Sequence, residues 1–265
     1  NDGFSGGEKK RTEILQMAQK ILEADGLASN TIVFFWGDHG RGLPRYKRWP
    51  YETGLRVPLL VRWPGQIKPG TVNDELVCLT DLAPTVLSMV GVKIPAYIQG
   101  RALFGEQKGP EPEYVFGGRN RMDLTSDDYI RTCRDKRFRY IHNFTPQVPY
   151  AQTIPYMEKS PILQEWRRLN AAGELAGPQK LWFAPHKPDE ELYDTAADPD
   201  EVNNLAGKPE HAATLKRMRA ALDTWMTDIH DLGGAPGNDF AGAGRDLVGG
   251  EPAVADWVSR FPKSS

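Results

Sequence analysis

The chain has 265 residues, which is enough for one or two domains with a sizeable hydrophobic core. It carries 33 lysine and arginine residues against 35 aspartate and glutamate residues, so its formal net charge is −2, which excludes a strongly basic nucleic-acid binder. Hydrophobic residues make up 40% of the chain, which excludes a wholly disordered protein, and no apolar stretch approaches the roughly 20 residues of a membrane span.

The first predicted element is an amphipathic helix that ends near Asp25. Its apolar positions recur at helical spacing and are expected to form its buried face: Ile14, Ala18, Ile21 and Leu22. Gly26 is the end signal, because glycine readily adopts the left-handed conformation that follows a helix.

Two short apolar runs then predict strands. Residues 31–36 (TIVFFW) are β-branched and then aromatic, which is typical of a strand buried on both faces. Residues 58–63 (PLLVRW) form the second run. A helix is expected from Thr80 to about Val90, with an apolar buried face made of Leu82, Val86, Met89 and Val90.

From about residue 110 the pattern changes to short β-like pieces separated by turn signals. They predict a small antiparallel sheet, with strands near residues 114–116, 129–133, 137–141 and 191–193. One helix is expected near residues 160–172, and a second, amphipathic helix follows Pro209. Residues 233–265 are rich in glycine, alanine and aspartate, and we expect a loosely ordered tail.

Polar residues follow the first predicted strand at its carboxyl end. Asp38 and His39 stand between glycines and are a plausible pair of metal ligands on a rigid strand end. Lys47, nine residues after Asp38, could return a positive charge to the same place. A metal with a nearby lysine would bind a tetrahedral oxyanion. The same residue types also fit a polar loop exposed to solvent.

A longer pattern surrounds these residues. It comprises Asp38, His39, Gly40, Lys47, Tyr51, Glu52, Gly54, Arg56, Val57 and Pro58. Further matching segments are residues 80–85 (TDLAPT), 191–194 (ELYD), 198–199, 201 and 204–205. Over about residues 19–232 the chain resembles the C-terminal half of the sulfatase family, in the alkaline-phosphatase-like superfamily.

The resemblance implies an α/β fold: part of an alkaline-phosphatase-like sulfatase core with a small antiparallel α+β C-terminal subdomain. It also implies metal-dependent hydrolysis of sulfate esters, with a sulfated small molecule or carbohydrate as partner. In the family, the residue matching Asp38 binds a divalent cation, usually calcium, and the residue matching His39 binds that cation or touches the sulfate. The residue matching Lys47 binds a sulfate oxygen. The segment from Arg119 to Asp123 resembles a part that lies beside the sugar in some family members, so Arg119 and Asp123 are predicted substrate contacts. The alternative is a turn exposed to solvent.

The chain departs from the family at the nucleophile. Sulfatases convert the first residue of a Cys-or-Ser-x-Pro-x-Arg motif to formylglycine. Neither cysteine matches, because Cys78 is followed by Leu-Thr and Cys133 by Arg-Asp, and no serine fits. We therefore expect the chain by itself to be inactive. A non-catalytic remnant that only binds anions is the alternative.

Residues 1–18 resemble a different family. They contain Ser5-Gly6-Gly7-Glu8, which is similar to the signature loop of the ABC-type ATPase of iron–sulfur cluster assembly. The resemblance raises the alternative of an ATP-binding subunit, but no G-x-x-x-x-G-K-[ST] phosphate loop is present. We interpret the chain as a chimera. Its predicted parts are residues 1–18, a core piece over 19–110, a subdomain over 111–232 and the tail.

Overall fold

The structure is a computed structural model that describes residues 6–121 and 127–234. Asp123 and all but the first two residues of the predicted tail lie outside this part of the chain. The helices are α1 (Gly6–Ala24), α2 (Glu52–Leu55), α3 (Leu82–Met89), α4 (Pro161–Ala171) and α5 (Ala212–Asp228). The strands are β1 (Val33–Trp36), β2 (Leu59–Arg62), β3 (Val115–Arg119), β4 (Ile130–Arg134), β5 (Phe138–Asn143) and β6 (Glu190–Asp194).

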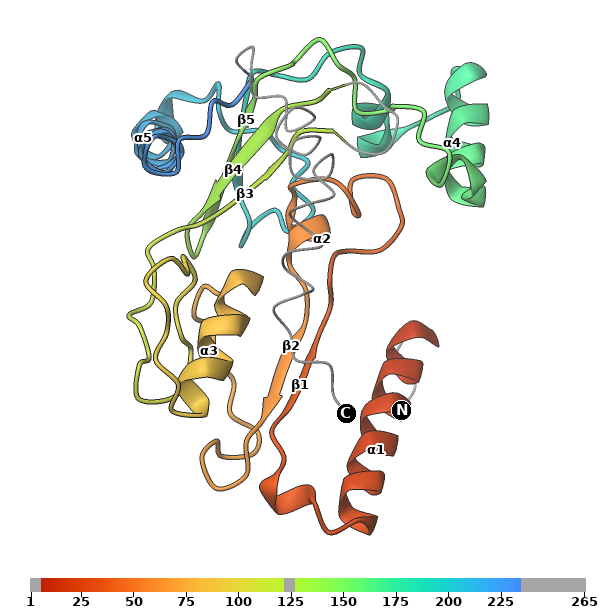
Figure 1. Cartoon of the computed structure of the whole chain (residues 1–265). Helices are drawn as coiled ribbons and strands as arrows, with labels where there is room; N and C mark the ends of the chain where they lie inside the picture. The colour runs from red at the N-terminus through yellow and green to blue at the C-terminus, as the bar shows by residue number, and fades with distance from the viewer. Residues whose placement is uncertain (1–5, 122–126, 235–265) are drawn as a thin grey trace, which may run out of the picture.

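The N-terminal part is a two-stranded antiparallel sheet of β1 and β2, with α1 and α3 on opposite sides of it (Figure 1). The expectation that residues 31–36 are buried on both faces is wrong: Trp36 is 48% exposed, and Leu60, which pairs with Phe35 across the sheet, is 53% exposed. The cause is the size of the sheet, since the described residues supply β1 with one neighbouring strand.

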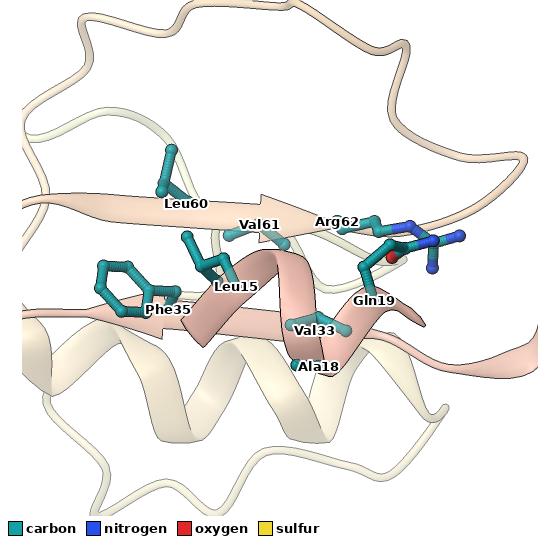
Figure 2. A pocket seen from close by; sticks show the side chains of 8 residues that line it. All are labelled: Leu15, Ala18, Gln19, Val33, Phe35, Leu60, Val61 and Arg62. Carbon is teal, nitrogen blue, oxygen red and sulfur yellow. The ribbon is translucent and has the colours of Figure 1, made fainter. Parts of the chain in front are cut away.

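Helix α1 runs without a break across residue 18 and ends where predicted, with Gly26 at φ 69°. Its predicted apolar face is partly wrong, because Ile14 and Ile21 are 55% and 51% exposed. The face turned to the strands carries Leu15, Ala18 and Gln19. These side chains border a groove of about 220 Å³ whose other wall is β1 and β2 (Figure 2).

Helix α3 buries a polar face instead of the predicted apolar one. Val86 and Val90 are 45% and 60% exposed, whereas Thr85 and Ser88 are buried. The Thr85 hydroxyl accepts a hydrogen bond from the backbone N–H of Leu103 at 2.8 Å. The helix therefore packs against the backbone of a long loop, which needs hydrogen-bonding groups and not an apolar stripe.

The C-terminal part is a four-stranded sheet in the order β3-β4-β5-β6, with every neighbouring pair antiparallel, as predicted. Helix α5 covers one face: Met218 and Leu222 are fully buried against Cys133 and Tyr140. No helix of the described residues is both long enough and apolar enough to cross a lipid bilayer.

The opposite side of the sheet packs against a segment from far away in the sequence. Trp49 and Tyr51, from the loop between β1 and β2, are 1% and 2% exposed and belong to the same hydrophobic core as Ile141 and Tyr193. In Figure 1 this orange loop rises from β1 to lie between the sheet and α4. The loop with the sulfatase-like residues is therefore part of the core of the C-terminal sheet.

Candidate functional site

Asp38 and His39 lie where β1 ends, as predicted. The backbone N–H of His39 donates to Asp38 Oδ1 at 2.9 Å, and His39 Nε2 lies 3.3 Å from Asp38 Oδ2. The side chain of Asp38 is 82% exposed. Its carboxylate is thus available to a ligand, and the imidazole contacts it directly.

These two side chains do not form a cation site by themselves. Calcium takes six to eight oxygen ligands, and Asp38 supplies carboxylate oxygens whereas His39 supplies nitrogen. The described residues contain no cluster of three or more histidine, cysteine, aspartate or glutamate side chains that could hold a metal. Asp38 fits the chemistry of one calcium ligand, and its role as a ligand stays a prediction.

The loop after His39 is closed by backbone contacts that require glycine. The Gly40 N–H donates to the Gly54 carbonyl at 2.9 Å. A Cβ at Gly40 would lie 1.9 Å from the Thr53 carbonyl oxygen, and one at Gly54 would lie 2.1 Å from the Trp49 carbonyl oxygen. Only glycine fits this close approach of two chain segments, which accounts for both glycines of the pattern.

Lys47 lies within this closed loop. Its backbone N–H donates to the Arg41 carbonyl at 2.8 Å, and its ammonium lies 5.2 Å from the centroid of the Tyr156 ring. The side chain is half-buried. The flanking residues Arg45 and Arg48 have φ of 63° and 78°, a strained conformation for arginine that the surrounding packing maintains. The convergence of Lys47 with Asp38 stays a prediction.

Arg119 is placed inside the protein, at the end of β3. Its guanidinium donates from Nη1 to the carbonyl of Arg48 at 3.1 Å and from Nη2 to Gln152 Oε1 at 3.1 Å. It also lies 4.0 Å above the Trp49 ring. Burial lowers the pKa of Arg119 to about 10. Because its side chain is 1% exposed, Arg119 here supports the backbone next to Lys47, and a direct contact with substrate stays a prediction.

Behind Arg119 lies a buried group of charges. Asp128 accepts from Lys187 Nζ at 2.7 Å and lies 3.3 Å from Arg119 Nη2, and all three side chains are almost completely buried. Burial lowers the pKa of Lys187, and the charge of Asp128 opposes this shift. One carboxylate thus balances two buried cations beside the loop.

A second buried carboxylate ties the loop to β6. Glu191 is 1% exposed and accepts hydrogen bonds from the hydroxyls of Tyr51, Tyr150 and Tyr193 at 2.8, 2.8 and 2.5 Å. Asn143 Nδ2 donates to the same carboxylate at 2.7 Å. Burial, followed by the charge of Glu191, raises the pKa of Tyr51 and of Tyr193.

A third group surrounds Glu52 and Glu201. Glu52 accepts from Arg134 Nε at 2.6 Å and from Arg139, and its backbone N–H donates to Glu201 Oε2 at 2.7 Å. Arg139 Nε lies 2.8 Å from Glu201 Oε1, as an ion pair that is not aligned for a hydrogen bond. Arg45 donates to the carbonyl of Glu201 at 2.7 Å. Residues 45–52 are therefore fixed from three directions.

Glu201 makes stability depend on pH. Burial raises its pKa to about 7, and the charge of Arg139 opposes the shift. Between about pH 4.5 and 7 the folded state binds more protons at this group than the unfolded state, so its contribution to stability is complete below about pH 4.5 and is lost as the pH rises through 7. The free energy of unfolding should therefore fall between pH 5 and pH 7.5, and we expect Glu201→Gln to make this fall smaller by up to about 3 kcal/mol. Urea unfolding at the two pH values measures the change. An equal pH dependence in the variant and the parent chain would contradict this.

Several residues that build the site are not among the predicted ones. Three of them lie in segments without hydrophobic periodicity, and no local sequence motif marks them as site residues: Asp128, Lys187 and Gln152. Glu191 and Glu201 belong to the sulfatase-like pattern, but the sequence does not show what they contact.

Comparison with known proteins shows similarity to sulfatases. The family described as N-sulphoglucosamine sulphohydrolase, C-terminal, matches residues 38–116. An ulvan-active sulfatase of Formosa agariphila is 43% identical over 219 residues, which cover 83% of this chain and 37% of that protein. Human N-sulphoglucosamine sulphohydrolase is 31% identical over 226 residues, covering 80% and 44%. The chain thus spans about two fifths of the length of these curated relatives.

Solved structures agree on the fold. A structure described as a complex with its substrate D-glucosamine-2-N,6-O-disulfate matches with a TM-score of 0.60 at 23% identity, over 83% of this chain and 39% of that one. The fold is that of alkaline-phosphatase-like sulfatases, mixed α/β with small antiparallel sheets. The matched signature region and the identities with these relatives together support the assignment of the chain to the sulfatase family.

Proposed function

We propose that the chain is the sulfate-binding C-terminal part of a sulfatase that acts on sulfated sugars. The observation that carries this proposal is the closed loop of residues 38–58, which lies in the matched family region and holds Lys47 on a rigid support. Relatives named as ulvan-active and N-sulphoglucosamine enzymes support sulfated sugars as the substrate class.

In this proposal each of the predicted site residues has a binding role. Lys47 donates a charge-assisted hydrogen bond to a sulfate oxygen and stabilises negative charge there. His39 contacts the sulfate or the cation, and Asp38 supplies one ligand to a divalent cation, which we propose to be calcium. Arg119 and Asp123 contact the sugar. The cation, when bound, supplies further charge stabilisation.

Hydrolysis needs more than these groups. The formylglycine of the family has no matching residue in the sequence, and binding groups cannot replace a nucleophile. We therefore propose that the 265 residues bind sulfate esters and do not hydrolyse them. We also propose that residues 1–18 have a foreign origin. The proposed boundaries between the parts of the chain lie at residues 18, 110 and 232. No observation favours ATP binding.

Lys47 provides the test. We expect Lys47→Ala to weaken the binding of inorganic sulfate by at least about tenfold, because a charge-assisted hydrogen bond contributes about 1.5–3 kcal/mol. Binding is measured by following backbone amide shifts in an NMR titration. Lys68→Ala, at an exposed lysine in the loop after β2, is the matched control and should leave the affinity unchanged.

Two results would contradict the proposal. One is equal sulfate affinity in Lys47→Ala and the parent chain. The other is hydrolysis of an aryl sulfate by the parent chain at a rate clearly above that of Lys47→Ala.

A further inference from the structure

Tyr156 combines an exposed ring with an anchored backbone. Its side chain is 53% exposed, although the residues around it, Ile154 and Met157, are 0% and 2% exposed and belong to the core. The Met157 N–H donates to the Ile154 carbonyl at 2.8 Å, which fixes the turn that carries Tyr156. The ring is therefore held at a defined place on the surface.

That place is next to the loop of Lys47. The ring centroid lies 5.2 Å from the Lys47 ammonium and 5.3 Å from the Arg48 guanidinium carbon. The hydroxyl reaches the other branch of the loop, where a Cβ at Gly42 would lie 2.6 Å from it. Gly42 thus leaves the space that the phenol occupies, and residues 42, 47 and 48 all meet one tyrosine.

Two cations beside an accessible aromatic ring suit a ligand that is both anionic and partly apolar. The face of a pyranose presents C–H groups that pack on an aromatic ring, while the tyrosine hydroxyl can bond to a sugar hydroxyl. Inorganic sulfate has no such face and would use the cations alone.

We propose that Tyr156 is a specificity residue that packs against the sugar ring whose sulfate Lys47 binds. This inference rests on the proposed function and adds to it the part of the substrate that the loop itself cannot recognise. A tyrosine that only held Lys47 in place through its ring would instead affect every anion equally.

The test compares two ligands, glucosamine-2-N,6-O-disulfate and inorganic sulfate, by NMR titration of the full chain. Tyr156→Ala should lower the affinity for the sugar about fivefold or more and leave the affinity for sulfate within about twofold, because only the sugar has a face that packs on the ring. Tyr156→Phe should retain most of the affinity for the sugar. Tyr97→Ala, at a tyrosine that is 83% exposed in the loop after α3, is the matched control.

Each outcome decides the matter. An unchanged ratio of the two affinities in Tyr156→Ala overturns the specificity role, whether both affinities persist or both fall together. If the parent chain binds neither ligand, the proposed function fails and this inference fails with it. If the parent chain binds sulfate through Lys47 but prefers the sugar no more than Tyr156→Ala does, only this inference fails.

Discussion

Replacing Glu191 with alanine is expected to lower the free energy of unfolding by about 4 kcal/mol, because the change leaves the buried hydroxyls of Tyr51, Tyr150 and Tyr193 without their acceptor. Asn143 loses a partner as well. Each buried group left without a partner costs about 1–3 kcal/mol, and the removal of one buried charge offsets part of the sum. Urea unfolding monitored by tryptophan fluorescence measures the change, since Trp49 lies in the same core.

The matched control is Glu165→Ala. Glu165 forms an exposed pair with Arg168 at 2.8 Å within α4, and such solvent-screened pairs contribute little to stability. Glu191→Gln keeps the shape and one acceptor oxygen, so its loss should fall between the two. A loss of less than about 1 kcal/mol in Glu191→Ala would show that the four donors find other partners.

The second large effect is expected at Asp128. Asp128→Ala leaves Lys187 and Arg119 as buried cations without a counter-charge, and breaking a buried ion pair in this way costs about 3–5 kcal/mol. The double variant Asp128→Leu, Lys187→Met removes one of the two cations and should recover part of the loss. Thermal or urea unfolding of the three proteins measures both steps.

Asp127→Ala serves as the control, because Asp127 is 45% exposed and pairs with Arg121 only at 3.6 Å. It should change the stability by less than about 0.5 kcal/mol. If Asp128→Ala and Asp127→Ala lower the free energy of unfolding by the same amount, Asp128 does not stabilise the buried charges of Lys187 and Arg119. The double variant would then show no recovery.

The C-terminal sheet could be predicted from the sequence because each of its strands is marked by its own residues and by the turn residues beside it. The strands β3 to β6 each contain β-branched or aromatic residues and lie between turn signals. The apolar stripe of α5 includes Met218 and Leu222, which are fully buried. The same reasoning failed for α3, whose buried Thr85 and Ser88 serve a loop backbone that periodicity does not reveal.

In the candidate site, too, some residues could be predicted from the sequence and others could not. Asp38, His39 and Lys47 could be predicted as site residues because they stand within one segment of a recognisable pattern. The partners that fix this segment come from distant parts of the chain, as in the contact of Tyr51 with Glu191, 140 residues away. Such pairings depend on the tertiary fold, and a single sequence carries no signal for them.

The burial of Trp49 and Tyr51 within the C-terminal core also bears on motion. Local opening of a protein occurs where few buried contacts must break, whereas segments within a core open only with the unit they belong to. The backbone of residues 49–54 is therefore expected to exchange its amide hydrogens together with the strands β4 to β6 and not as an independent lid. If the loop binds a ligand as proposed, the adjustment would come from the side chains of Lys47 and Tyr156 and not from this backbone.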